Sequence, residues 1–302
     1  MALPNSWKRN ISLRVSDHGG VTLETDLFRI RGHVADFDAV VADIVAASAR
    51  TRDLVPMLAD VAYGDGPSEA LDIFFPKGPR DNLPVHMFIH GGYWRMWSKR
   101  EYSCVANTVT QAGAIAVIVD YALMPGVRMP VIIDQMVRAK KWVIEHIAEH
   151  GGDPGSLTIS GHSAGAHLAT FLIQGNSGAS DVQAAFLLGG VYDLAPLQQS
   201  FLKDEISLTN EEVAAFSPIS QTHNPGCQVT IAVGENETVP FHKQAETFAA
   251  VLKKQGSVVS FSVMRERDHM TSVRDLGRPN SDTGVALANT IKQTSPAGLT
   301  GP

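Results

Sequence analysis

The chain has 302 residues, of which 44% are hydrophobic and 19% charged, with 2 Cys and a formal net charge of −6. This composition excludes a disordered, fibrous or disulfide-stapled protein, because a chain of this length and apolar content can bury a large core. The acidic balance, with no basic stretch longer than a pair such as Lys99-Arg100, argues against nucleic acid as a partner.

The sequence also predicts where the protein resides. Residues 1–10 are mostly polar and precede no apolar run, so they are not typical of a secretory signal. No window offers the roughly 18 uninterrupted apolar residues of a membrane span. We therefore expect a cytoplasmic protein without a membrane partner.

Residues 1–60 are predicted to form an N-terminal extension that packs on the main domain. A helix is predicted in this part from apolar residues at spacings of three and four, which are Val34, Phe37, Val41, Ile44 and Val45. The main domain is expected at residues 61–293. Residues 294–302 are expected to form a flexible tail.

From Glu69 onward, short apolar runs alternate with longer amphipathic segments. The runs that predict strands are Leu71–Phe75, Val85–Ile89, Ala114–Val119, Leu157–Ser160, Ala185–Leu188, Val229–Val233 and Val258–Met264. The segments that predict helices are Glu101–Gln111, Val131–His150, Ala164–Gln174, Phe241–Lys254 and Gly284–Lys292. The alternation predicts an α/β fold with a mostly parallel central sheet flanked by helices. The long interval at about residues 194–224, with a helical piece near Asn210–Phe216, predicts a small cap insertion.

A motif that carries chemistry lies between a predicted strand and a predicted helix. Residues 161–165 read Gly-His-Ser-Ala-Gly. A sharp strand-to-helix turn exposes the serine hydroxyl and needs small flanking residues, so the motif predicts Ser163 as a nucleophile. The alternative is an ordinary helix-capping serine, which explains neither Gly161 nor Gly165.

A second motif, His-Gly-Gly-Tyr-Trp at residues 90–94, follows a predicted strand. A loop with two glycines can bring backbone N–H groups close to a reacting carbonyl oxygen. We expect an oxyanion hole made by the Ala164 N–H and by a donor within Gly91, Gly92 and Tyr93, with Gly92 or Tyr93 favoured. His90 is expected to orient this loop by a hydrogen bond. The alternative is a plain glycine turn.

Four side chains are candidates for contact with a substrate: Tyr93, Trp94, His162 and Tyr192. Tyr93 and Trp94 follow the glycines of the loop, so they are expected to form a wall of the pocket. Either of them could instead pack in the core.

A serine nucleophile needs a base, which follows the last strand when the triad order is serine, acid, histidine. His269 is the histidine beyond the predicted strand Val258–Met264. His223, in the cap region, and His242, at a helix start, are the alternatives.

This reasoning leaves three candidates for the acid of the triad. Glu235 and Glu237 follow the predicted strand Val229–Val233, and Asp193 follows an earlier one. Asp268 adjoins the expected base in sequence and can hardly turn back to orient its ring.

At this point the chain resembles α/β hydrolases of the kynurenine formamidase (arylformamidase) type, within the esterases that carry a His-Gly-Gly loop. Besides the two motifs above, the resemblance rests on Ala62-Tyr63-Gly64, Leu71-Asp72-Ile73-Phe74-Phe75-Pro76, Gly151-Gly152-Asp153-Pro154, Ala166-His167-Leu168 and Gly190-Val191-Tyr192-Asp193-Leu194. It covers roughly residues 60 to 275. The family places its acid three residues after a Val-Gly pair and four before a Phe, which implies Glu237. Its histidine lies between an acidic and an apolar residue, as His269 does; vertebrate members carry aspartate at the position of Glu237.

The resemblance implies a serine hydrolase with a Ser163–His269–Glu237 triad and an acyl-enzyme intermediate. It implies hydrolysis of an N-formylated aromatic amine, without a metal or an organic cofactor. A carboxylesterase or amidase on small substrates is the alternative, and a non-catalytic binding protein on a hydrolase fold is a third. The expected partner is a small-molecule substrate, and a homodimer is left open.

Overall fold

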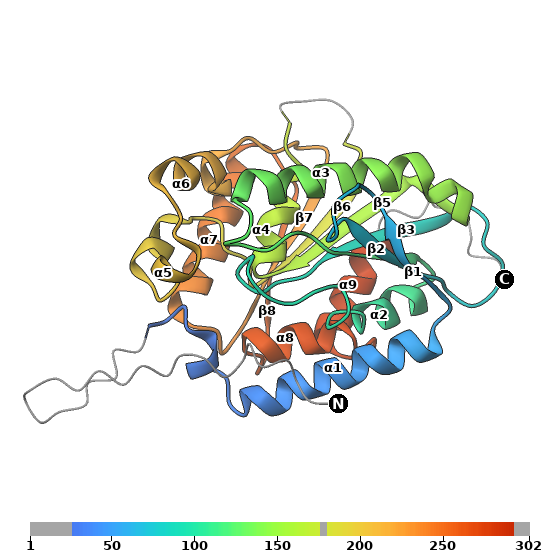
Figure 1. The fold of residues 1–302 in the computed structure, drawn as a ribbon, viewed down its shortest axis with the longest axis horizontal. Helices are drawn as coiled ribbons and strands as arrows, with labels where there is room; N and C mark the ends of the chain where they lie inside the picture. The colour runs from blue at the N-terminus through green and yellow to red at the C-terminus, as the bar shows by residue number, and fades with distance from the viewer. Residues whose placement is uncertain (1–25, 176–179, 293–302) are drawn as a thin grey trace, which may run out of the picture.

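The computed structural model describes residues 26–175 and 180–292, and within them eight strands form one sheet (Figure 1). The strands are β1 (Met57–Ala62), β2 (Ala70–Phe74), β3 (Leu83–Ile89), β4 (Ile115–Val119), β5 (Gly152–His162), β6 (Ala184–Leu188), β7 (Gln228–Gly234) and β8 (Val259–Met264). Their order in the sheet is β1-β2-β4-β3-β5-β6-β7-β8. β2 is antiparallel to both its neighbours, and the other pairs are parallel. The prediction of a mostly parallel sheet is confirmed, and with it the α/β-hydrolase fold.

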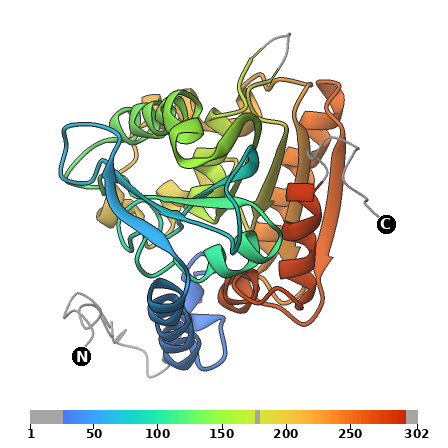
Figure 2. The ribbon, with the colours of Figure 1, turned by 90° about the vertical axis from the view of Figure 1, so that its right-hand side faces the viewer.

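Helices cover both faces of this sheet. They are α1 (Phe37–Leu54), α2 (Val105–Gln111), α3 (Met129–His146), α4 (Ala164–Phe171), α5 (Lys203–Ile206), α6 (Asn210–Phe216), α7 (Val239–Lys254), α8 (His269–Leu276) and α9 (Asp282–Lys292). Short 3-10 helices lie at Ile30–Gly32, Ile147–His150, Ala195–Gln199 and Pro218–Ser220. α3, α4 and α7 lie on one face, and α2, α8 and α9 on the other (Figure 1, Figure 2). Within the described residues, no helix combines the length and the apolar character that crossing a bilayer requires.

Strand β1 was not predicted, because Asp60 interrupts its apolar residues and the predicted strands begin only after Glu69. It is an edge strand whose residues are exposed or half-buried. Its pairing with β2 shifts between Leu58 and Val61. Asp60, inside that shift, has a φ of 55° and donates its N–H to Asp72 Oδ1 at 2.8 Å. A bulged, solvent-exposed edge needs no period-two pattern of apolar residues, so the sequence shows little sign of it.

The predicted division of the chain into extension, domain and tail stays a prediction. The predicted helix of the extension is α1, which packs against α8 and α2. β1 crosses the predicted boundary at residue 60, so the sheet begins within the extension as it was drawn. Residues 1–25 and the tail at 294–302 lie outside the described residues.

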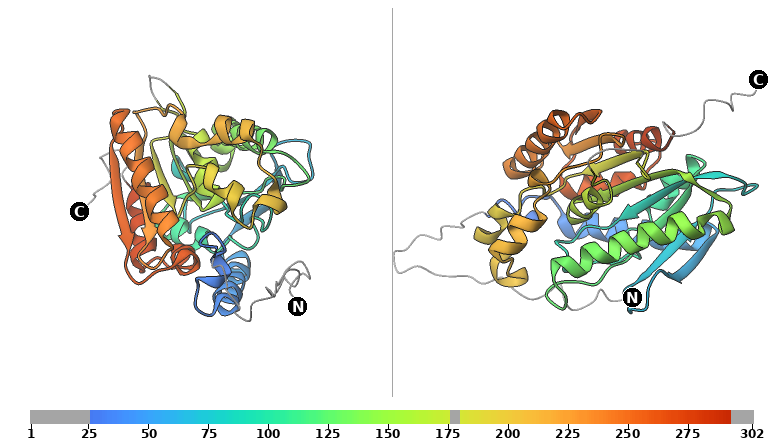
Figure 3. Two further views of the ribbon diagram at one scale, coloured as in Figure 1. Left: turned by 90° about the vertical axis from the view of Figure 1, so that its left-hand side faces the viewer. Right: turned by 90° about the horizontal axis from the view of Figure 1, so that it is seen from above.

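The predicted cap interval runs between β6 and β7. It contains α5, α6 and two of the 3-10 helices. α6 begins after Thr209, whose hydroxyl accepts the Glu212 N–H at 3.1 Å while the Glu212 carboxylate accepts the Thr209 N–H at 3.1 Å. This reciprocal capping explains why a helix of 7 residues forms here. α5 and α6 lie at the edge of the molecule that also carries the first described residues (Figure 3, left).

The core of the sheet should depend on Ile159, which is fully buried at the centre of β5. Ile159→Ala is expected to lower the free energy of unfolding by about 2–5 kcal/mol, because it leaves a cavity in the core against the face of β5. Val131→Ala, at a position that is 43% exposed on α3, is the matched control and should change it by less than about 0.5 kcal/mol. Urea unfolding followed by circular dichroism measures both, and equal losses would contradict the assignment of the core.

Candidate active site

The turn from β5 into α4 places Ser163 in a strained backbone conformation. Its φ is 55° and its ψ is −119°, in a region that residues with a Cβ atom avoid. The Ser163 N–H donates to the Leu188 carbonyl at 2.8 Å, which anchors the turn to β6. The Ser163 side chain makes no helix-capping hydrogen bond. The alternative interpretation as a capping serine therefore does not describe this turn.

The two glycines of the motif allow backbones to touch. A Cβ atom at Gly161 would lie 2.2 Å from the Gly165 carbonyl oxygen. A Cβ atom at Gly165 would lie 2.0 Å from the Ile89 carbonyl oxygen, at the end of β3. Both distances are far below van der Waals contact, so any side chain at either position would push α4 away from the sheet.

The structure brings His269 and Glu237 into direct contact. His269 Nδ1 donates to Glu237 Oε2 at 2.7 Å, and the other carboxylate oxygen accepts the Gly234 N–H at 2.8 Å. The Glu237 side chain is fully buried, and that of His269 is 5% exposed. Because Nδ1 carries the proton, Nε2 is left with a free lone pair, which is the state that a general base needs.

Helix α8 begins at His269, and Asp268 caps it. Asp268 Oδ1 accepts the N–H groups of Met270 and Thr271 at 2.9 and 2.8 Å. The Asp268 carboxylate is thus engaged with its own helix, in agreement with the expectation that it cannot orient the His269 ring. The Phe241 ring, whose centroid is 4.5 Å from that of His269, packs against the imidazole.

The alternative acids serve other hydrogen bonds. Glu235 Oε2 accepts the Glu266 N–H at 2.8 Å. Asp193 Oδ1 accepts the Ala195 N–H at 3.0 Å, as a residue at a turn does. Of the three predicted candidates, the one that contacts His269 is Glu237.

The alternative base His223 lies in the cap interval. Its Nδ1 is 3.2 Å from Gln255 Oε1, and burial lowers its pKa. His242 is half-buried in the first turn of α7.

The loop at residues 90–94 adjoins the serine turn. A Cβ atom at Gly91 would lie 3.2 Å from Ser163 Cβ, so the loop backbone runs directly beside the nucleophile candidate. His90 Nδ1 donates to the Gly91 carbonyl at 2.8 Å, and its ring stacks on Tyr121 with centroids 4.2 Å apart. The prediction that His90 hydrogen-bonds its own loop is confirmed.

Tyr93 and Trp94 both have a positive φ, of 51° and 57°. Two consecutive residues in this region need external restraint. The Tyr93 hydroxyl donates to the Phe28 carbonyl at 2.6 Å, and Trp94 Nε1 donates to His167 Nδ1 at 3.2 Å. These bonds hold the strained loop in place from two sides.

The four predicted substrate contacts are all buried. Trp94 and Tyr192 have no exposed surface, and Tyr192 stacks on Phe248 with centroids 4.2 Å apart. The burial of these two favours packing over contact with a ligand. Tyr93 and His162 are buried beside the serine turn. Substrate contact by any of the four stays a prediction.

A contact that the sequence analysis missed comes from the first described residues. The Leu27 carbonyl accepts the Thr238 hydroxyl at 2.7 Å, next to Glu237, while the Phe28 carbonyl accepts Tyr93. The Phe28 ring lies edge-on to Phe241 with centroids 5.8 Å apart. Residues 26–31 thus connect the loop after β3 with the loop after β7. No motif marks them, because they contribute two backbone carbonyls and one ring.

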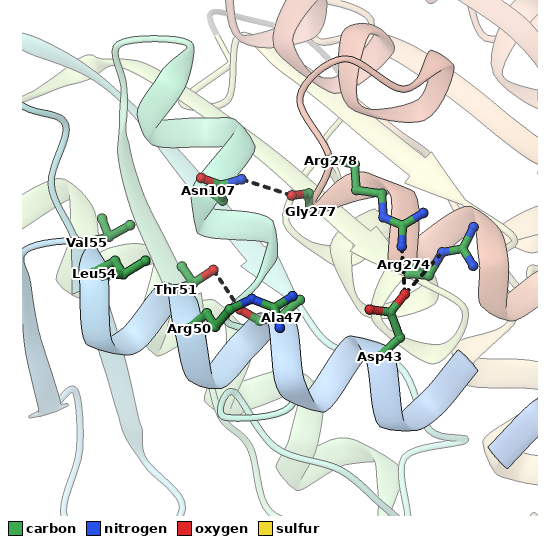
Figure 4. Close-up of a pocket in the computed structure, with 10 residues that line it drawn as sticks. All are labelled: Asp43, Ala47, Arg50, Thr51, Leu54, Val55, Asn107, Arg274, Gly277 and Arg278. Atoms are coloured by element: carbon green, nitrogen blue, oxygen red, sulfur yellow. Dashed lines mark hydrogen bonds and ion pairs between the residues drawn. The ribbon is translucent and has the colours of Figure 1, made fainter. Parts of the chain in front are cut away.

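A hollow of about 230 Å³ lies elsewhere, between α1, α2 and the far end of α8 (Figure 4). Asp43 pairs there with Arg278 at 2.6 Å and lies 4.0 Å from Arg274 (Figure 4). None of its lining residues belongs to the predicted site. Within residues 26–175 and 180–292, no group of three His, Cys, Asp or Glu side chains is placed to hold a metal ion.

Comparisons with known proteins agree with the observed fold. A family model described as alpha/beta hydrolase fold matches residues 86–272. The kynurenine formamidase of Danio rerio is 32% identical over 247 residues, which cover 79% of this chain and 83% of that protein. The esterase LipQ of Mycobacterium tuberculosis is 31% identical over 244 residues, which cover 72% and 58%. A solved esterase of Pyrobaculum calidifontis has a TM-score of 0.64 at 21% identity, covers 86% of this chain and 93% of that chain, and shows the same fold.

The close approach at Gly165 should make it intolerant of a methyl group. Gly165→Ala is expected to lower the free energy of unfolding by about 1–3 kcal/mol or more, because the added Cβ would overlap the Ile89 carbonyl. Gly32→Ala is the matched control, because a Cβ atom there meets nothing within 4 Å, and it should change stability by less than about 0.5 kcal/mol. Urea unfolding of both variants measures the two changes in stability. If Gly165→Ala unfolds like the wild type, the close packing of Gly165 is refuted.

Proposed function

Because the chain belongs to the α/β-hydrolase fold family and is a hydrolase, we propose that Ser163, His269 and Glu237 form its catalytic triad. The observation that carries the proposal is the buried hydrogen bond between His269 Nδ1 and Glu237 Oε2, at 2.7 Å. This hydrogen bond lies at the carboxyl ends of the parallel strands β5, β7 and β8. The strained Ser163 lies at the same ends. Nucleophilic acyl transfer needs a base with an oriented lone pair close to a nucleophilic hydroxyl.

In the proposed mechanism, His269 Nε2 takes the proton of the Ser163 hydroxyl while Oγ attacks the carbonyl carbon of the substrate. Glu237 holds the ring in the required tautomer and stabilises the imidazolium that forms. The imidazolium then gives its proton to the departing amine or alcohol. A water molecule, deprotonated by His269, attacks the acyl-enzyme, and the acid product leaves as Ser163 regains its proton.

The developing oxyanion is proposed to bind between the turn at residues 161–165 and the loop at residues 90–94, which is called the Gly-Gly loop below. Ala164 is the first residue of α4, so its N–H has no acceptor within the helix, and the helix N-terminus favours negative charge. The second donor is the N–H of Gly92 or Tyr93, from the loop that runs beside Ser163. Each such donor contributes about 3 kcal/mol to transition-state stabilisation.

The proposed substrate is an N-formylated aromatic amine, which makes the protein an arylformamidase. The similarity to the formamidase of Danio rerio supports this reading. The site supports it too, because Ser163 is only 2% exposed and a formyl group carries no acyl chain that needs room. A carboxylesterase is the second candidate, supported by the similarity to LipQ.

The substrate class can be tested by comparing the wild type with Ser163→Ala on N-formylkynurenine and on p-nitrophenyl esters of increasing chain length. The wild type should release formate, and the variant should be slower by about 10⁴-fold or more, because it lacks the nucleophile. Release of formate is measured enzymatically and release of p-nitrophenol by absorbance.

Fast turnover of butyrate or longer esters with no cleavage of the formamide would reject the arylformamidase in favour of the carboxylesterase. Failure of a fluorophosphonate probe to label Ser163 would remove the serine-hydrolase mechanism itself and favour a binding protein.

The identity of the acid can be tested separately. Glu237→Gln keeps the shape of the side chain but removes the charge that orients His269, so kcat should fall by about 10³- to 10⁴-fold. Glu235→Gln, two residues away and bonded to the Glu266 N–H, is the matched control and should leave kcat unchanged. Steady-state kinetics on p-nitrophenyl acetate measures both. A larger loss at 235 than at 237 would reverse the assignment.

A further inference from the structure

Both ring nitrogens of His162 lie within hydrogen-bonding distance of another residue. Its Nε2 lies 3.0 Å from the backbone carbonyl oxygen of His269. Its Nδ1 lies 3.4 Å from the Tyr102 hydroxyl. The residue is 1% exposed, so neither nitrogen is offered to solvent.

These partners fix the tautomer of the ring. A backbone carbonyl can only accept, so Nε2 must carry the proton and donate it to His269. Nδ1 is then an acceptor, and the Tyr102 hydroxyl is its donor. Because both ring nitrogens are used, His162 has no hydrogen-bonding capacity left for a substrate.

The ring must also be neutral to fill this place. Burial, together with the neighbouring His269, holds the pKa of His162 well below its usual range. The two rings lie with centroids 4.5 Å apart, so a charge on His162 would oppose the imidazolium that His269 is proposed to form. A neutral N–H donor supports the base without competing with it.

The hydrogen bond of His162 links the segment that carries Ser163 to the segment that carries His269. His162 directly precedes Ser163, and its acceptor is the backbone of His269, 107 residues further on. The Ser272 hydroxyl donates to the same carbonyl at 3.1 Å, so the first turn of α8 is held on two sides. Glu237 holds the ring of His269, whereas His162 holds its main chain.

The same ring also reaches the Gly-Gly loop. A Cβ atom at Gly91 would lie 3.0 Å from His162 Nδ1. One imidazole therefore touches the loop proposed to bind the oxyanion, the backbone of the nucleophile and the backbone of the base.

We propose that His162 is a positioning residue, which sets the separation between Ser163 and His269 through its hydrogen bond to the His269 carbonyl. This inference rests on the proposed triad. It replaces the prediction that His162 binds substrate. The measurable consequence is that losing the Nε2 donor lowers kcat and leaves KM nearly unchanged.

The test compares His162→Gln with His162→Asn. The glutamine amide nitrogen can occupy the place of Nε2 and donate to His269, whereas the asparagine amide is one methylene shorter and reaches only the place of Nδ1. His162→Asn is expected to lose about 10- to 100-fold in kcat, because it removes one of the two side-chain donors that hold the His269 carbonyl and lets the backbone of the base shift. His162→Gln is expected to recover most of that loss. Both variants are polar and similar in size, and thermal unfolding checks that both fold.

Kinetics on p-nitrophenyl acetate and the rate of fluorophosphonate labelling of Ser163 provide two readouts. The proposal is overturned if asparagine and glutamine behave alike, if either raises KM while kcat is unchanged, or if asparagine stays within about threefold of the wild type. Labelling of the wild type separates failure of the His162 proposal from failure of the proposed function. A wild type that labels but cleaves no formamide leaves the His162 test intact, whereas a wild type that does not label removes the triad on which it rests.

Discussion

The packing of α4 against the end of β3 is the constraint on which the site depends. Gly165 lies so close to the Ile89 carbonyl that a Cβ atom would be 2.0 Å from it. This contact lets the helix start directly after the nucleophile candidate Ser163, whose φ is positive. The loop at residues 90–94 lies beside Ser163 because that loop begins where β3 ends. The strained turn at Ser163 and the loop proposed to bind the oxyanion thus meet where α4 packs against β3.

Parallel strands bring the remaining groups to this point. Consecutive crossovers return the chain to the same edge of the sheet, so the residues after β5, β6, β7 and β8 meet although they are far apart in sequence. A Cβ atom at Gly189, after β6, would lie 3.1 Å from both Glu237 Oε1 and His269 Nδ1. Glu237 and His269 therefore pack against the backbone that follows β6. Their hydrogen bond is buried, and in the proposed mechanism this burial would preorganise the pair for proton transfer.

The sequence predicted the parts of this arrangement that follow from periodicity and from backbone geometry. Buried strands such as β4 and β6 are apolar throughout, and the glycines beside Ser163 indicate a tight turn. It could not separate Glu235 from Glu237 without the resemblance, because two residues of a loop after a strand have no periodicity. Nor could it place Tyr192, whose aromatic ring suits a pocket wall and a core equally well. β1 was missed because Asp60, at its bulge, interrupts a short apolar stretch that lies outside the alternation of strands and helices.

The contacts of residues 26–31 show a different limit. They bind the site through the carbonyls of Leu27 and Phe28, and every residue has a carbonyl. The triad candidates come from strand ends that the fold fixes, whereas the rings near His269 come from a segment at the edge of the chain's described part and from α7. The proposed triad and the segment at residues 26–31 therefore belong to different parts of the chain. A formamidase and an esterase can share the proposed triad, so the residues that distinguish their substrates must be sought outside the Ser163 motif.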